Sequence, residues 1–149
     1  MAVENAHEVA MVVTLQNERK SPFGLVVTGQ AESWQPALEQ IVGRQWLITY
    51  RVHGRDELLQ VVKDGVADAA VLDDQADMGM DVMQMLRLIR RVDAMLPVVV
   101  VSGQVDRRFM ENALKLAAFS VVQRPLALEE LLRQLSRIMQ RLDGMMRGE

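Results

Sequence analysis

The sequence contains no cysteine, which excludes disulfides, thiol nucleophiles and thiolate metal sites together. Its only histidines are His7 and His53, so a histidine-based metal cluster is not expected. The net charge of −3 provides no basic surface for neutralising the phosphates of nucleic acid. The apolar runs are too short to cross a membrane, and no basic region precedes the first of them as in a secretory signal. These absences predict a cytoplasmic protein without nucleic-acid or membrane partners.

The motifs of several enzyme and ligand-binding classes are also missing. The sequence has no Walker motif, no dinucleotide-binding glycine pattern, no nucleophile elbow and no recognisable catalytic triad. Aspartates cluster at 73, 74, 77 and 81, but their spacing does not match the alternating ligands, central glycine and terminal glutamate of a calcium loop. We therefore predict a protein that is not an enzyme and carries no resident cofactor.

What is present is a regular alternation of apolar runs and amphipathic segments. With 149 residues, half of them hydrophobic, the chain suits one domain with a full core. The apolar runs predict strands at 24–28, 46–52, 69–73, 98–102 and 119–123. Apolar residues at helical spacing predict helices at 34–42, 56–64, 81–93, 106–117 and 127–143. Because strands such as 98–102 are apolar on both faces, we expect an α/β fold with one doubly wound, five-stranded parallel sheet.

Two segments lie outside this plan, so we divide the chain into residues 1–22, 23–143 and 144–149. The first is an N-terminal extension whose β-prone stretch 8–16 predicts an extra edge strand, pairing with another copy of the chain, or a frayed tail. The apolar positions of the last helix continue through Met145 and Met146 with nearly heptad spacing. This extended helix either packs on the sheet over its first half or forms a seam with a partner or a second copy.

Local signals at three helix starts and at the two tryptophans favour structural roles. Ser33, Asp81 and Asp106 precede the first, third and fourth predicted helices and are expected to cap them. Trp34 and Trp46 are expected to pack in the core or against helices rather than to form a ligand platform. The many methionines between 78 and 85 suit adaptable packing.

Polar groups stand at the carboxyl ends of three predicted strands. Asp73 and Asp74 end the third strand, Ser102 ends the fourth, and Arg124 follows the fifth. In doubly wound sheets, ligand chemistry gathers outside the carboxyl ends of the strands. Carboxylate, hydroxyl and cation therefore predict an anion-handling corner at this edge.

In these motifs the chain resembles the receiver domain of bacterial two-component response regulators, over residues 23–142. The resemblance depends on the order and spacing of several motifs rather than on any one of them. They are Pro97-Val-Val-Val-Val-Ser102-Gly103, Val121-Val-Gln-Arg124-Pro125-Leu-Ala-Leu-Glu-Glu-Leu-Leu, Asp68-Ala-Ala-Val-Leu-Asp73 and Gly79-Met80-Asp81. It implies the flavodoxin-like (βα)5 receiver fold.

The resemblance also implies roles for individual residues. Asp73 occupies the phosphoacceptor position, with Asp74 as a rival because counting back from Gly79-Met80-Asp81 favours it by one place. Ser102 occupies the position of the hydroxyl that contacts the phosphoryl group. Arg124 occupies the position of the lysine that pairs with that group.

The chain departs from the family at the magnesium site, where receivers carry two acids at the end of the first strand. Here the positions are Thr28 and Gly29. Magnesium normally offsets the charge that develops when a phosphoryl group moves onto a carboxylate, so its loss bears directly on phosphorylation. Glu32 or Asp77 could replace the missing ligands from neighbouring loops. Mg²⁺ is thus expected only if the protein accepts phosphate.

Further departures concern the cation and the switch. Arg124 is a planar, permanently charged fork that could pair with Asp73 or Asp74, either imitating the phosphorylated arrangement or forming an ordinary structural ion pair. Val121 stands where the family usually has an aromatic switch residue, and the loop after the third strand lacks the family's usual proline.

The resemblance and its departures predict an atypical receiver, or pseudo-receiver, that signals through protein–protein contact with phosphorylation weak or absent. One alternative is a working receiver that takes phosphate from a histidine kinase at Asp73, and another is a flavodoxin-like binder of a small ligand. The partner would be a histidine kinase, another signalling protein or a second copy docking on helix 106–117, strand 119–123 and helix 127–143. The arginines expected to provide polar contacts on that surface are Arg107, Arg108, Arg133 and Arg137.

Overall fold

The structure of the protein is a computed structural model, and it describes residues 22–29, 34–76 and 78–146, with side chains up to residue 142. The predictions for the N-terminal stretch 8–16, for Glu32, Ser33 and Asp77 and for the side chains of Met145 and Met146 lie outside the described residues.

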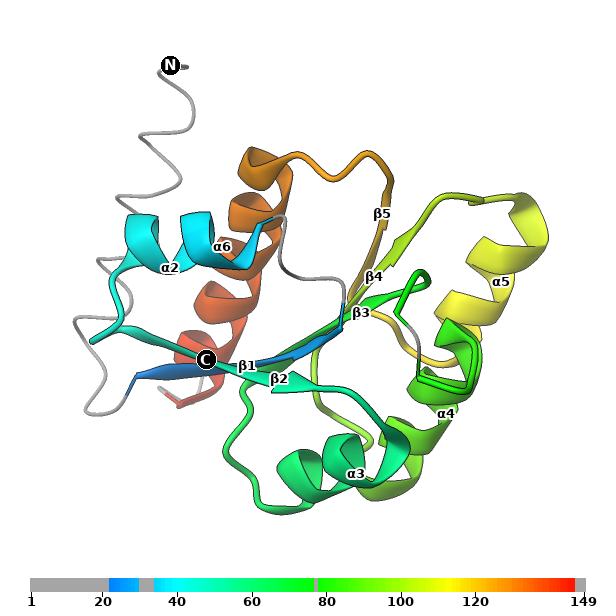
Figure 1. Cartoon of the computed structure of the whole chain (residues 1–149), viewed down its shortest axis with the longest axis horizontal. Helices are drawn as coiled ribbons and strands as arrows, with labels where there is room; N and C mark the ends of the chain where they lie inside the picture. The colour runs from blue at the N-terminus through cyan, green and yellow to red at the C-terminus, as the bar shows by residue number, and fades with distance from the viewer. Residues whose placement is uncertain (1–21, 30–33, 77, 147–149) are drawn as a thin grey trace.

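Five strands alternate with five helices along the described chain (Figure 1). The strands are β1 (Phe23–Thr28), β2 (Leu47–Val52), β3 (Ala69–Asp73), β4 (Val98–Ser102) and β5 (Ser120–Gln123). The helices are α2 (Gln35–Val42), α3 (Arg55–Lys63), α4 (Val82–Val92), α5 (Arg107–Lys115) and α6 (Leu128–Met146). These bounds confirm every predicted strand and helix to within a few residues.

The strands form one parallel sheet in the order β2-β1-β3-β4-β5, which confirms the predicted flavodoxin-like receiver fold. The register pairs Asp73 with Val101 and Ser102 with Gln123. All carboxyl ends therefore meet at one edge of the sheet.

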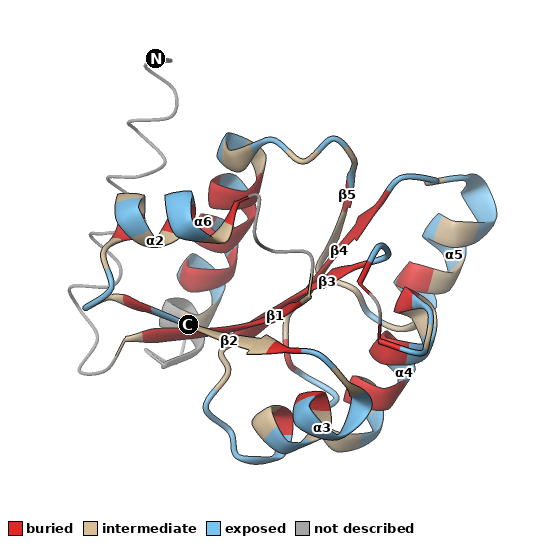
Figure 2. Cartoon of the chain, in the orientation of Figure 1, coloured by how far each residue is buried: buried red, intermediate tan, exposed pale blue. Residues whose placement is uncertain are grey.

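Each face of the sheet carries its own apolar core (Figure 2). Helices α2 and α6 cover one face, where Leu38 of α2 and Leu135 of α6 pack against alternate residues of the central strands. Helices α3, α4 and α5 cover the other face, with Leu58 of α3 and Leu86 of α4 fully buried. Residues Val98 to Val101 are at most 1% exposed because they face both cores in turn.

Helix α6 resolves one of the alternatives left open by the sequence. Its apolar positions Leu131, Leu135 and Ile138 are buried in the core on the protein's own sheet, and Leu128 and Leu142 pack against the same cluster. The prediction of an intermolecular seam is therefore wrong over this part of the helix, because these side chains already have an intramolecular partner.

Within the described residues, no helix has both the length and the apolar character to span a membrane.

Several local predictions are confirmed. Asp81 caps α4 in a capping box, exchanging hydrogen bonds with Gln84 at 2.8 Å in both directions. Asp106 caps α5 by accepting a hydrogen bond from the Phe109 N–H at 2.8 Å. Trp34 is buried and Trp46 packs on the core beside α2, as expected for packing residues.

Candidate functional site

The predicted polar residues gather at the carboxyl edge of the sheet, at the ends of β3, β4 and β5. Asp73 is the last residue of β3 and Ser102 the last of β4, while Arg124 directly follows β5. The Asp74 N–H donates to the carbonyl of Val101 at 3.0 Å, and the Arg124 N–H donates to that of Ser102 at 2.9 Å. These backbone bonds extend the strand pairing by one step and hold the four residues together. We refer to Asp73, Asp74, Ser102 and Arg124 as the edge cluster.

Arg124 binds both aspartates. Its Nη2 donates to Oδ1 of Asp73 and to Oδ1 of Asp74, and both contacts are ion pairs. The Arg124 side chain is 21% exposed and those of Asp73 and Asp74 are 11% and 26% exposed, so water screens these pairs only in part. The adjacent carboxylates of the two residues proposed as rivals for the phosphoacceptor position therefore share one guanidinium, which offsets part of their combined negative charge.

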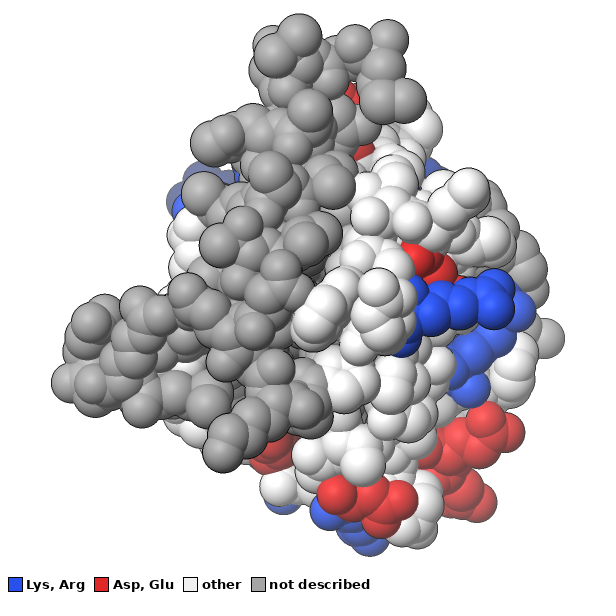
Figure 3. Space-filling view, turned by 90° about the vertical axis from the view of Figure 1, so that its left-hand side faces the viewer, with Lys and Arg blue, Asp and Glu red and all other residues white. Residues whose placement is uncertain are grey.

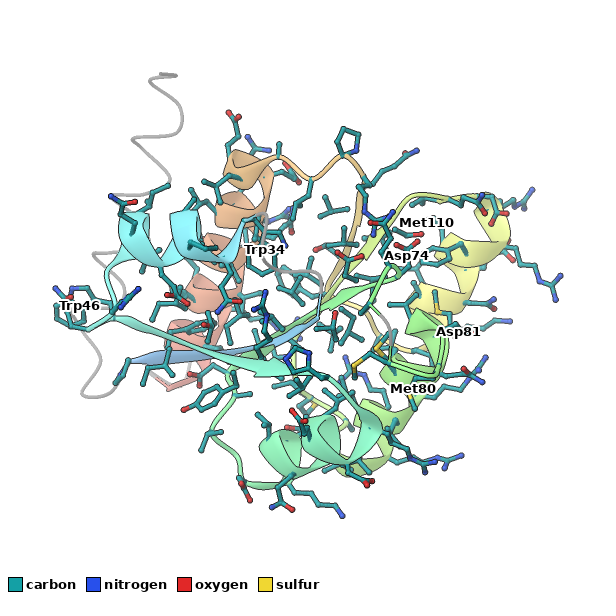
Figure 4. All side chains as sticks on the ribbon, viewed as in Figure 1. Trp34, Trp46, Asp74, Met80, Asp81 and Met110 are labelled. Carbon is teal, nitrogen blue, oxygen red and sulfur yellow. The ribbon has the colours of Figure 1, made fainter. Side chains whose placement is uncertain are left out.

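The second oxygen of Asp74 is also engaged. Asp74 Oδ2 accepts a hydrogen bond from the Ser102 hydroxyl at 2.8 Å and one from the Gly103 N–H at 3.0 Å. Partial burial raises the pKa of the Asp74 carboxyl, but the hydrogen bonds from Arg124, Ser102 and Gly103 outweigh it, so the pKa lies below its ordinary value. In Figure 4, Asp74 lies at the ends of β3 and β4, whereas Asp81 lies apart from it at the start of α4.

Thr28 and Asp73 are joined across β1 and β3. The Thr28 hydroxyl accepts a hydrogen bond from the Asp73 N–H at 2.9 Å, and Thr28 is only 2% exposed. Asp73 Oδ1 also accepts from the Gln75 N–H at 2.8 Å, which shapes the start of the following loop. The residue at the end of β1 therefore positions the backbone of the edge cluster.

These residues do not fit a magnesium ion. Thr28 and Gly29 offer no carboxylate, and the oxygens of Asp73 and Asp74 nearest to Arg124 already bind a guanidinium. Among the described residues, no three His, Cys, Asp or Glu side chains lie together in a group that could hold a metal. Steric crowding does not prevent a larger residue at position 29. A Cβ at Gly29 would lie 3.6 Å from His53 Nδ1, which is an ordinary van der Waals contact.

Two residues of the site were not foreseen from the sequence. Gly103 supplies a backbone N–H to Asp74 and leaves room for the arginine, because a Cβ there would lie 3.2 Å from Arg124 Nη1. The role of Thr28 as an acceptor for the Asp73 N–H was also missed. A glycine after Ser102 and a threonine at the end of a buried strand were the available signals, but neither identifies its partner in sequence.

The arginines predicted to make protein contacts lie away from the edge cluster. Arg107 and Arg108 are exposed in the first turn of α5, where Arg107 pairs with Glu111 at 3.1 Å. Arg133 and Arg137 are exposed on α6, and Arg133 pairs with Glu130. On the face shown in Figure 3, basic and acidic side chains form separate small areas rather than one continuous basic surface.

Solved structures with the same fold include receiver domains. A two-component response regulator from Clostridium difficile is 17% identical with a TM-score of 0.68, and the match covers 80% of this chain and 98% of that one. A CheY-like receiver domain protein from Methanospirillum hungatei JF-1 is 13% identical with a TM-score of 0.70, covering 84% and 99%. The beryllofluoride-activated NtrC4 receiver domain dimer is 18% identical with a TM-score of 0.67, covering 79% and 97%. At these identities the likeness shows the fold alone.

A comparison with curated proteins found no match. The sequence profile of the response regulator receiver domain, in contrast, matches residues 11–136, which is most of the chain. The match includes all five strands and each member of the edge cluster. The chain therefore belongs to the receiver domain family of two-component response regulators.

Proposed function

We propose that this chain is an atypical receiver that signals through protein–protein contact, with phosphorylation at its edge cluster weak or absent. The observation that carries the proposal is the binding of one guanidinium to both Asp73 and Asp74. A phosphoryl group arriving at either carboxylate would have to displace a charge-assisted contact with Arg124. The described residues at the end of β1 provide no acid with which a metal could offset the added charge.

The same contact supports a constitutive arrangement of the site. Arginine cannot lose its proton and its charge stays in place, so the pairing with Asp73 and Asp74 persists across the physiological pH range. Ser102 is meanwhile held on Asp74. The hydroxyl, cation and carboxylates are thus mutually satisfied without a phosphoryl group.

The surface best suited to a partner is formed by α5, β5 and α6. Leu114 at the end of α5 is 68% exposed, and it lines a hollow of about 460 Å³ with Phe119 and Arg137. An exposed leucine beside arginines is the composition found at the centre and rim of protein interfaces. The NtrC4 receiver domain was solved as a dimer, and we propose that this chain either forms a homodimer or docks a signalling protein, such as a histidine kinase, through this surface.

Intact mass spectrometry after incubation with a small phosphodonor tests the proposal. The wild type, Asp73→Asn and Asp74→Asn proteins are each incubated with and without Mg²⁺, beside a receiver with an intact acid pair as a positive control. We expect little or no phosphoryl adduct on the wild type under either condition. An adduct that requires Mg²⁺ and disappears in one variant would instead establish a working phosphoacceptor and identify the aspartate.

A gain-of-function variant makes the same test more demanding. Thr28→Asp combined with Gly29→Asp and Arg124→Lys restores the acids and the point charge found in the family. We expect this variant to acquire a Mg²⁺-dependent adduct on Asp73 or Asp74. If neither it nor the wild type is labelled, the missing acid pair and the arginine are not what limits phosphorylation.

A further inference from the structure

A second concave surface lies between α3 and α4, away from the edge cluster. It is a hollow of about 400 Å³, and three of the residues that line it are arginines: Arg55, Arg87 and Arg91. Among the residues that the structure describes, no acidic one lines it. Arg55 is the first residue of α3, while Arg87 and Arg91 lie one turn apart on α4. We refer to this feature as the arginine hollow.

The three arginines are exposed, and none has a salt bridge or side-chain hydrogen bond within residues 22–29, 34–76 and 78–146. Two of the neighbouring acids, Asp81 and Glu57, bond to backbone N–H groups instead. Asp81 caps α4, and Glu57 accepts a hydrogen bond from the His53 N–H at 3.3 Å. The positive charge of the hollow is therefore available to an external anion.

Two of these arginines occupy positions that electrostatics disfavours. Arg55 stands at the N-terminus of α3, where the partial positive charge of the helix repels a cation. Arg87 and Arg91 are like charges four residues apart on one helix, which weakens the helix. Of the three, only Arg91 is favourably placed, because it lies in the last turn of α4, where the partial negative charge of the helix attracts a cation. A bound anion would relieve both unfavourable interactions at once.

The rest of the lining indicates what kind of anion fits. Met80, which lies at the start of α4 in Figure 4, and Leu88, which is 8% exposed, add apolar surface to the hollow. Gln84 uses its side-chain oxygen in the capping box, which leaves its amide nitrogen as a further donor. None of the described residues that line the hollow is aromatic, so among them a nucleotide base would find nothing to stack on. Carboxylates beside an apolar side chain match this combination.

We propose that the arginine hollow is a docking site for an acidic peptide segment of a partner protein. Guanidinium forks bind carboxylates in a bidentate manner, and Met80 and Leu88 would receive an apolar side chain that lies between the acids. The site is separate from the α5, β5 and α6 surface and does not depend on phosphorylation. Two of its residues, Gly79 and Met80, belong to the β3–α4 loop that also contains Asp74. A bound peptide would therefore contact the loop that begins at the edge cluster.

Fluorescence anisotropy with a pool of labelled peptides tests this inference. The peptides contain glutamate, aspartate, leucine and glycine in random order, and a matched pool replaces the acids by their amides. We expect the acidic pool, but not the amide pool, to bind the full chain, with a Kd that rises with salt. Replacing Arg55, Arg87 and Arg91 by Gln is expected to raise the Kd at least about tenfold.

The matched control removes the same number of positive charges elsewhere, through Arg44→Gln, Lys63→Gln and Lys115→Gln. It is expected to bind within about twofold of the wild type, because it leaves the hollow intact. Circular dichroism and thermal unfolding verify that both triple variants are folded. Three outcomes would overturn the inference: no binding of the acidic pool to the wild type, equal loss in both triple variants, or hollow-dependent binding of pyrophosphate or single-stranded RNA in place of the peptides.

Discussion

Thr28 and Asp73 are linked by a hydrogen bond from the Asp73 N–H to the Thr28 hydroxyl at 2.9 Å, in a place where Thr28 is almost completely buried. The hydroxyl satisfies a backbone donor at the end of β3 that has little access to water. The end of β1 thus contributes to the geometry of the edge cluster without carrying charge.

Replacing Thr28 by valine should therefore destabilise the protein. Valine keeps the shape but leaves the Asp73 N–H without this acceptor, which costs about 1–3 kcal/mol of unfolding free energy. Urea denaturation measures the change. Thr28→Ser retains the hydroxyl and should lose clearly less stability. Equal losses in the two variants would mean that the methyl group, rather than the hydrogen bond, matters.

Replacing Arg124 by glutamine should destabilise the protein by about 1–3 kcal/mol, because the carboxylates of Asp73 and Asp74 lose the cation they share. Denaturation by urea at neutral pH is the measurement, with the exposed Arg108→Gln as a control for net charge. Adding Asp74→Asn to the Arg124 variant should recover part of the loss, since it removes one of the two unpaired charges. Additive losses in the double variant would contradict the shared pairing.

The lowered pKa of Asp74 predicts how its contribution to stability depends on pH. A carboxyl whose pKa is lower in the folded than in the unfolded state stabilises the protein above its ordinary pKa of 3.8. That stabilisation is lost as the pH falls through the folded-state value. The difference in unfolding free energy between wild type and Asp74→Asn should be largest near neutral pH and should shrink below 3.8. The pKa of Glu39 is also lowered, by hydrogen bonds from Thr49 and Gln35, but Glu39 titrates in both proteins and cancels. A difference that does not vary with pH would contradict this prediction.

Gly24 in β1 should not tolerate even alanine. A Cβ at this position would lie 2.1 Å from the carbonyl oxygen of Val66, and backbone cannot move aside as a flexible side chain can. Gly24 also exchanges hydrogen bonds with Asp68, donating to its carboxylate at 2.8 Å and accepting from its N–H at 2.7 Å. Gly24→Ala should lower the unfolding free energy by about 3 kcal/mol or more, whereas Gly54→Ala, where a Cβ meets nothing within 4 Å, should cost well under half of that. Thermal unfolding compares the two variants.

The proposed interface on α5, β5 and α6 predicts a change of mass in solution. Met110 and Leu114 are 37% and 68% exposed on α5, and replacing both by glutamate places charge in the interface. If the chain forms a homodimer there, analytical ultracentrifugation should find that this variant is a monomer while the wild type is a dimer. Val66→Glu, at a position that is 43% exposed outside this surface, should leave the dimer intact. A wild type that stays monomeric at all concentrations would leave only a heterologous partner for the surface.

The secondary structure of this chain could be predicted well because its signals are local. The run Val98 to Ser102 is apolar on both faces and was predicted as a strand with the bounds that the structure has. Asp81 and Asp106 marked two helix starts through their capping chemistry, which needs only residues within one turn. Alternating strands and helices also placed Asp73, Ser102 and Arg124 at one edge, since parallel strands all end on the same side.

The sequence by itself thus determined the fold, its family and the residues that meet at the carboxyl edge. Only the tertiary structure decided how these residues pair: that Arg124 binds both aspartates, that Ser102 lies on Asp74 rather than Asp73, and that the Thr28 hydroxyl holds the Asp73 N–H. The structure also decided that Arg55 shares a hollow with Arg87 and Arg91. These contacts join residues far apart in the chain, and they follow from strand order, register and helix packing. Local propensity and periodicity carry no information about such geometry.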